Sequence, residues 1–171
     1  MNVLFIYTNI KGFHEDTYSF GLASIVSIAK KNNYNTKVIL VKTQDEYQNV
    51  LDEIQSFKPG VAAFTSVSSQ FIYVKELASL IKSRFPSIIT VCGGIHPTLF
   101  PDCLLEAPAL DGIFIGEGEY SFIEFLEKLK NGGTYFEIDN FGYAIDGKIR
   151  INRLKPLIQN LDELPFPDRE T

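Results

Sequence analysis

Few side chains in this sequence have the type and spacing that catalysis requires. His14 and His96 are the only histidines, so a zinc site would have to be built largely from carboxylates. Glu117 and Glu119 stand two residues apart and could serve as a general acid and base. Glu119 also falls at the start of an expected helix, where a carboxylate complements the helix dipole. No nucleophile has a base beside it, so we predict no catalytic residue and no metal site, and the sequence favours a binding module.

Glycines at the ends of two apolar runs are the strongest candidates for ligand contact. The run 88–92 stops at Gly93 and Gly94, and the run 112–115 stops at a Gly-Glu-Gly-Glu sequence over 116–119. Residues without a Cβ permit positive φ and let a bulky group approach the main chain. A tight turn without a ligand is the alternative explanation for the glycine pair. Because both runs resemble neighbouring strands that end at one side of a sheet, we expect a ligand at that edge.

Polar residues stand beside these glycines. His96 and Pro97 follow the glycine pair, and His96 is expected either to contact the ligand or to bond a nearby carbonyl. A hydroxyl-rich stretch over 65–69 follows another apolar run. One of Ser68 and Ser69 is expected to cap the helix that begins there.

Strands and helices alternate along most of the chain. Five apolar runs predict strands over residues 2–8, 36–41, 61–65, 88–92 and 111–115. Apolar residues spaced three and four apart predict helices over 20–32, 45–57, 70–84 and 120–130, with a short one at 102–106. This order predicts an α/β fold with a flavodoxin-like (Rossmann-like), doubly wound sheet of five parallel strands in the order 2-1-3-4-5.

The last part of the chain has a different pattern. Residues 140–145 and 148–152 alternate apolar and polar side chains around Asp146-Gly147, which is a strong signal for a C-terminal β-hairpin. The residues after 159 contain two prolines without periodicity. We therefore expect an α/β domain over 1–135, a hairpin appendage over 136–158 and a linker over 159–171.

Composition excludes several classes of protein. The 16 basic and 21 acidic residues give a net charge of −5 without a basic stripe, so a nucleic-acid partner is not expected. No run approaches the roughly 18 apolar residues of a membrane span, so no membrane association is expected either. The two cysteines, Cys92 and Cys103, are expected to be reduced, as is typical of a cytoplasmic protein.

Several nucleotide and phosphate sites that this fold can carry are not encoded. The glycine-rich fingerprint of a dinucleotide site does not follow the first strand, and no P-loop is present. A response regulator would need acidic residues where this chain has Tyr7, Thr8 and Thr65. The acidic sequence His14-Glu-Asp disfavours the phosphate of a flavin.

Three motifs resemble one known family. They are Cys92-Gly-Gly-Ile-His-Pro-Thr98 with Pro101, Asp111-Gly-Ile-Phe-Ile-Gly-Glu-Gly-Glu119, and Leu161-Asp-Glu-Leu-Pro-Phe-Pro-Asp-Arg169. In this order they resemble the amino-terminal cobalamin (vitamin B12)-binding domain of radical SAM enzymes. That group includes methyltransferases and the anaerobic magnesium-protoporphyrin monomethyl ester cyclase. The resemblance covers nearly the whole chain.

The resemblance implies where a cobalamin would lie. Its corrin ring would cover the carboxyl ends of the strands, and its nucleotide tail would pass beside the glycines after the fourth strand. Gly21 matches the glycine that opens the first helix in this family, and Thr65 and Ser66 match a hydroxyl segment that contacts the tail. The implied cofactor-binding residues are Gly21, Thr65, Ser66, Gly93, Gly94, His96, Pro97, Gly116, Glu117, Gly118 and Glu119.

The chain departs from related patterns in two places. The Asp-x-His-x-x-Gly motif that supplies a cobalt ligand in the methionine-synthase type is missing around His14, so His14 is not expected to bind cobalt. The Cys-x-x-x-Cys-x-x-Cys triad of radical SAM enzymes is also missing. A [4Fe-4S] cluster and S-adenosylmethionine are therefore expected in a downstream radical SAM domain of the same polypeptide, a parent oxidoreductase or methyltransferase, and this chain alone should have no turnover.

Two other hypotheses remain open from the sequence. One is a flavodoxin-like regulatory or interaction domain without a cofactor, and the other is a stand-alone corrinoid carrier.

Overall fold

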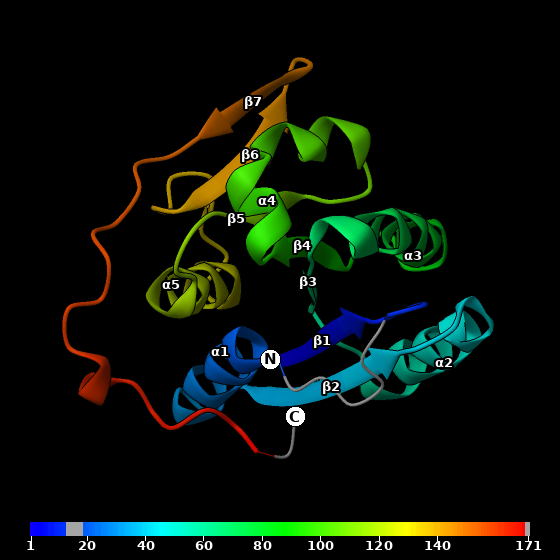
Figure 1. Cartoon of the computed structure of the whole chain (residues 1–171), viewed down its shortest axis with the longest axis horizontal. Coiled ribbons are helices and arrows are strands. Elements are labelled where there is room, and N and C mark those ends of the chain that lie inside the picture. The colour runs from blue at the N-terminus through cyan, green and yellow to red at the C-terminus, as the bar shows by residue number, and fades with distance from the viewer. Residues whose placement is uncertain (13–18, 170–171) are drawn as a thin grey trace.

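A single sheet of seven strands forms the centre of the computed structural model, which describes residues 1–12 and 19–169. Its order is β2-β1-β3-β4-β5-β6-β7. The first five strands are parallel, and β6 and β7 are antiparallel. The strands are β1 (Asn2–Thr8), β2 (Asn35–Val41), β3 (Val61–Thr65), β4 (Ile89–Gly93), β5 (Gly112–Phe114), β6 (Phe141–Ile145) and β7 (Lys148–Ile151) (Figure 1).

Helices cover both faces of this sheet (Figure 1). The α-helices are α1 (Phe20–Lys31), α2 (Tyr47–Phe57), α3 (Phe71–Arg84), α4 (Ile95–Leu99) and α5 (Glu119–Lys130). Short 3₁₀ helices are η1 (Gln44–Glu46), η2 (Ser68–Gln70), η3 (Pro101–Glu106) and η4 (Leu161–Glu163). None of the helices in the described ranges is long and apolar enough to cross a membrane.

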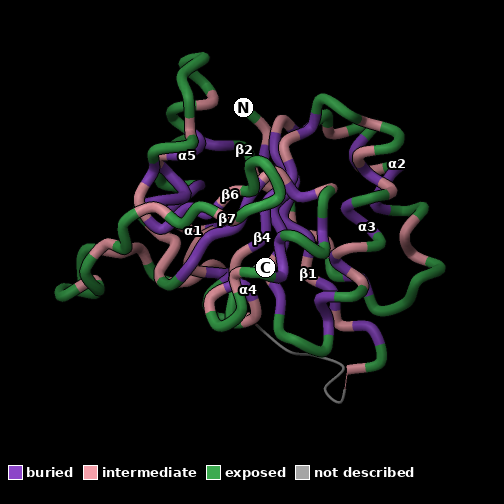
Figure 2. Tube along the Cα trace, turned by 90° about the horizontal axis from the view of Figure 1, so that it is seen from above, coloured by how far each residue is buried: buried purple, intermediate pink, exposed green. Residues whose placement is uncertain are grey.

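The parallel strands are apolar at nearly every position because both of their faces are buried. In β1, Leu4 and Ile6 pack into the core beneath α2 and α3, whereas Val3 and Phe5 pack into the core beneath α1 and α5. Figure 2 shows buried residues concentrated along the strands and exposed residues on the outer sides of the helices. The predicted α/β class and the 2-1-3-4-5 order of the parallel strands are confirmed.

The strand count differs from the prediction because the hairpin continues the sheet. β6 pairs with β5, and Phe141 lies opposite Phe114. The ring of Phe141 occupies space that a Cβ on Gly112 would need, so this glycine permits the close approach. Phe141 also lies 5.2 Å from the Phe114 ring and 5.7 Å from the Phe125 ring. The hairpin therefore closes the core beneath α5.

The segment after β7 lies along helices α5 and α1. Two hydrogen bonds join its backbone to α1: Ser27 Oγ donates to the Phe166 carbonyl at 2.6 Å, and the Asp168 amide donates to the Ala23 carbonyl at 3.1 Å. Lys30 and Asp168 form an ion pair at 2.9 Å. The described part of the expected linker, residues 159–169, is thus docked on the domain, although it contains only one helical turn, η4.

Replacing Phe141 with alanine tests whether the hairpin is part of the core. Phe141 is fully buried among aromatic rings, so Phe141→Ala should lower the free energy of unfolding by about 3–5 kcal/mol. Phe166→Ala is the matched control, because Phe166 is 90% exposed and its loss should change stability by less than about 0.5 kcal/mol. Urea unfolding followed by circular dichroism measures both, and equal small effects would contradict a core role for the hairpin.

Candidate functional site

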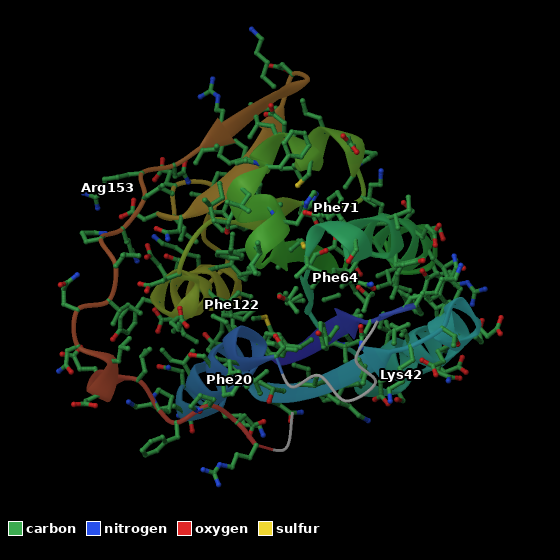
Figure 3. All side chains as sticks on the ribbon, viewed as in Figure 1. Phe20, Lys42, Phe64, Phe71, Phe122 and Arg153 are labelled. Atoms are coloured by element: carbon green, nitrogen blue, oxygen red, sulfur yellow. The ribbon has the colours of Figure 1, made fainter. Side chains whose placement is uncertain are left out.

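A cavity of about 260 Å³ lies between helices α1 and α5 and reaches the carboxyl ends of β3, β4 and β5. Parallel strands place these ends at one edge, so the loops that follow them meet there. The cavity is lined by Phe5, Gly21, Leu22, Ile25, Ala63, Phe64, Thr65, Val91, Gly93, Gly94, Phe114, Gly116, Glu117, Gly118, Glu119 and Phe122. Phe64 and Phe122, which line it from β3 and α5, are labelled in Figure 3.

Apolar side chains form the deep part of the cavity. Phe5, Ala63 and Val91 are in register across β1, β3 and β4, so they point to the same face of the sheet. Ala63 stands between two larger side chains, and its small size leaves room above the sheet. Phe122 closes the side formed by α5. Such a wall suits a flat, apolar group and offers it few hydrogen-bond partners.

Eight of the eleven predicted cofactor-binding residues line this cavity. They are Gly21, Thr65, Gly93, Gly94, Gly116, Glu117, Gly118 and Glu119. Ser66, His96 and Pro97 lie outside the lining. His96 and Pro97 belong to the short helix α4, which the sequence pattern did not predict.

Gly94 brings the ends of β3 and β4 together. Its φ is +98°, and a Cβ there would lie 2.8 Å from both Thr65 Oγ1 and the Ser66 carbonyl oxygen. The Ser66 amide donates to the Gly93 carbonyl at 3.0 Å, and the Ser66 carbonyl accepts from the His96 amide at 3.0 Å. The space that a side chain at Gly94 would take is therefore occupied by the protein's own atoms, whereas the sequence suggested that a ligand would need it. The backbone of Ser66 thus links the end of β3 to the end of β4 and to the start of α4.

Thr98 connects the two glycine-bearing loops. Its hydroxyl donates to the Gly94 carbonyl at 2.8 Å and accepts from the Gly116 amide at 3.0 Å. Sequence reasoning missed this role, although Thr98 stands in the motif after the glycine pair. The available signal was the threonine hydroxyl four residues after Gly94.

The two glutamates of the second glycine-bearing loop accept hydrogen bonds from different segments of the chain. Glu119 is the first residue of α5, and its Oε1 accepts from Ser24 Oγ of α1 at 3.0 Å. Glu117 Oε2 accepts from the Ile158 amide at 2.6 Å. These contacts hold structure at the rim of the cavity, so they favour a binding role over an acid-base pair.

His96 is half-buried beside α3. Its Nδ1 lies 3.0 Å from Ser68 Oγ, and its ring centroid lies 4.4 Å from that of Phe71. Burial lowers the pKa of His96 below its usual value of 6.5, with a smaller opposing effect from Glu106. The imidazole is therefore mainly neutral at pH 7.

The prediction that Ser68 or Ser69 caps α3 is wrong. Neither Ser68 nor Ser69 caps that helix: both lie in η2, and the residue at the N-cap of α3, Gln70, makes no side-chain capping bond. The Ser68 hydroxyl bonds His96 instead. A 3₁₀ turn often precedes an α-helix, and here the turn η2 contains both serines, so α3 begins only at Phe71.

Both cysteines are free and buried on the sheet face covered by α2 and α3. Burial raises the pKa of both thiols, that of Cys103 to about 11. They are therefore protonated at pH 7 and unsuited to bind a metal as thiolates. His14 lies outside the described residues, so the expectation about its role stays a prediction.

Comparison with known proteins places this chain in a family. The model of the B12 binding domain matches residues 8–126, which is more than half of the chain. An uncharacterized methyltransferase, PH0819, of Pyrococcus horikoshii is 30% identical over 149 residues, covering 86% of this chain and 32% of the relative. The anaerobic magnesium-protoporphyrin IX monomethyl ester cyclase of Rubrivivax gelatinosus is 31% identical, covering 96% of this chain and 32% of the relative. The chain thus spans about one third of the length of these relatives.

Solved structures share the fold. OxsB, a cobalamin-dependent S-adenosylmethionine radical enzyme solved with aqua-cobalamin and S-adenosylmethionine, superimposes with a TM-score of 0.83 at 19% identity over 97% of this chain and 24% of its own. TsrM, a radical S-adenosylmethionine methyltransferase of Kitasatospora setae, was solved with cobalamin and a [4Fe-4S] cluster. It superimposes with a TM-score of 0.77 at 14% identity, over 90% of this chain and 31% of its own. With the family model matching from the end of β1 into α5, this chain belongs to the B12 binding domain family.

Proposed function

We propose that this chain is the cobalamin-binding module of a radical SAM enzyme that carries out methyl transfer or oxidative cyclisation. The observation that carries the proposal is the apolar cavity between α1 and α5, which opens at the glycine-bearing edge of the sheet. The methyltransferase and cyclase relatives support the type of parent enzyme.

The residues at this edge fit a cobalamin. The nucleotide tail would enter the cavity beside Gly93 and Gly94, where the lining is mostly apolar and a flat base can be buried. The corrin ring would lie over the edge itself, where Ile95 and Leu99 of α4 are exposed by 60% and 77%. Exposed apolar side chains beside a cavity are typical of a surface that a ligand or partner covers.

Bound cobalamin supplies a cobalt centre that changes oxidation state and can carry a methyl group. The chain's own residues bind and orient the cofactor. The paired loops around Gly94 and Gly116 shape the opening, and the Glu119–Ser24 hydrogen bond holds α5 to α1 across it. We assign no catalytic residue to this module.

The remaining cofactors belong to a further domain in this proposal. A [4Fe-4S] cluster needs thiolates, and Cys92 and Cys103 are buried and protonated at pH 7. The relatives are about three times as long as this chain, which supports a radical SAM domain in the same polypeptide that binds the cluster and S-adenosylmethionine. A cytoplasmic location is part of the proposal and is supported by the two free thiols.

Titration with hydroxocobalamin tests the proposed function. The purified chain should retain the corrin absorbance through gel filtration. At free ligand a hundredfold above the dissociation constant it should gain about 2.7 kcal/mol in stability. Absence of co-elution and of any thermal shift would refute cobalamin binding and leave a cofactor-free interaction domain as the better account.

Gly21 offers a separate test of the cavity. It lines the mouth in the first turn of α1, and a Cβ built on it meets no atom within 4 Å. Gly21→Leu should keep or raise the stability of the free chain, by up to about 1 kcal/mol, because glycine is a poor helix former. It should also weaken hydroxocobalamin binding by more than about tenfold, because the side chain occupies the mouth.

The matched control at this position is Gly21→Ala, which changes helix propensity with little added volume and should weaken binding less. If Gly21→Leu binds as tightly as the wild type, the cavity is not the site.

His96 should act through packing and not as a ligand of cobalt. Because its pKa is lowered in the folded chain, the unfolded chain binds more protons below about pH 6.5, and stability should fall as the pH drops through that range. His96→Gln should reduce this pH dependence in urea unfolding at pH 7.5 and 5.5. It should leave the visible spectrum of bound corrinoid unchanged, and a spectral shift would indicate coordination by His96.

A further inference from the structure

Asn140 lies where three segments of the chain meet. It is 3% exposed and has a φ of +63°, immediately before β6. Its Nδ2 donates to the Ile115 carbonyl at 2.9 Å and to the Glu117 carbonyl at 3.0 Å, and its Oδ1 accepts from the Lys155 amide at 2.6 Å. Every hydrogen-bonding group of the amide side chain except one lone pair of Oδ1 is thus engaged.

The loop held by Asn140 is the second glycine-bearing loop of the cavity. Gly116, Glu117 and Gly118 all contribute to the lining. Gly116 has a φ of +73°, so its own backbone preferences do little to fix the loop. The two Asn140 bonds bracket this residue by holding the carbonyls before and after it.

The same loop has a second link to the segment after β7. Glu117 Oε2 accepts from the Ile158 amide, and Lys155 Nζ pairs with Glu124 of α5 at 2.9 Å. Figure 1 shows this segment leaving β7 and passing α5 toward α1. Neither Asn140 nor the segment lines the cavity.

We propose that Asn140 is a positioning residue of the cofactor site: it holds the 115–118 loop in the shape that accepts a corrinoid and ties that shape to the segment 153–158. The identity of the ligand rests on the proposed function. Cofactor affinity should then depend on a residue that does not line the cofactor cavity. A residue that served the fold alone would change affinity only as far as it changed overall stability.

The variant Asn140→Gly isolates the side chain, because glycine adopts positive φ without strain. Asn33→Gly is the matched control: Asn33 has a φ of +62°, is exposed, and lies between α1 and β2 at the opposite edge of the sheet. Loss of two hydrogen bonds to the loop should raise the dissociation constant for hydroxocobalamin by about tenfold to thirtyfold in Asn140→Gly. Asn33→Gly should stay within about twofold of the wild type.

A second readout needs no ligand. In the ligand-free chain, amide hydrogen exchange of residues 116–118 should become faster in Asn140→Gly and stay unchanged in Asn33→Gly, because the loop has lost its anchor. Asn140→Asp keeps the side-chain shape and the acceptor for the Lys155 amide but lacks both N–H donors, so it should show the same two effects. This variant replaces Asn140→Gly in both measurements if Asn140→Gly fails to fold.

Affinities of Asn140→Gly and Asn140→Asp within about twofold of the wild type, or unchanged exchange at 116–118, would overturn the proposal. Failure of the wild-type chain to bind hydroxocobalamin would instead refute the proposed function. In that case the exchange comparison would still decide whether Asn140 holds the loop.

Discussion

The site depends on the close approach of two strand ends at Gly94. A side chain there would collide with Thr65 Oγ1 and the Ser66 carbonyl oxygen. The approach lets the His96 amide bond Ser66 and starts α4 directly after β4, which places Thr98 between the Gly94 carbonyl and the Gly116 amide. One position without a Cβ thus connects the ends of β3, β4 and β5, and the cavity opens beside that connection.

Much of this arrangement follows from patterns along the chain. Buried parallel strands and the glycines after them are local signals, so the 2-1-3-4-5 order could be predicted, and so could the edge of the sheet where the glycine-bearing loops meet beside the cavity. The apolar wall could not, because it depends on Phe5, Ala63 and Val91 meeting in register across three strands. The joining of β6 to the sheet depends in the same way on the Phe141 ring lying over Gly112, a contact between residues 29 positions apart.

The polar contacts at the edge assign different tasks to residues that look alike in the sequence. Glu119 joins α5 to α1, while Glu117 bonds the Ile158 amide. Ser66 supports Gly94, while Ser68 bonds His96. These contacts lie at the rim, and each of them holds two segments of the chain together. In the proposed function the module holds the cofactor, and the reactive chemistry belongs to the cofactor and to the rest of the parent enzyme.

In the proposed function, the cavity between α1 and α5 receives the nucleotide tail of cobalamin. Comparing the affinity of the chain for cobalamin with its affinity for cobinamide, which lacks that tail, tests the claim directly by isothermal titration calorimetry. Burial of a flat base against Phe5, Val91 and Phe122 predicts that cobalamin binds more than about tenfold tighter. Equal affinities for the two corrinoids would contradict the claim.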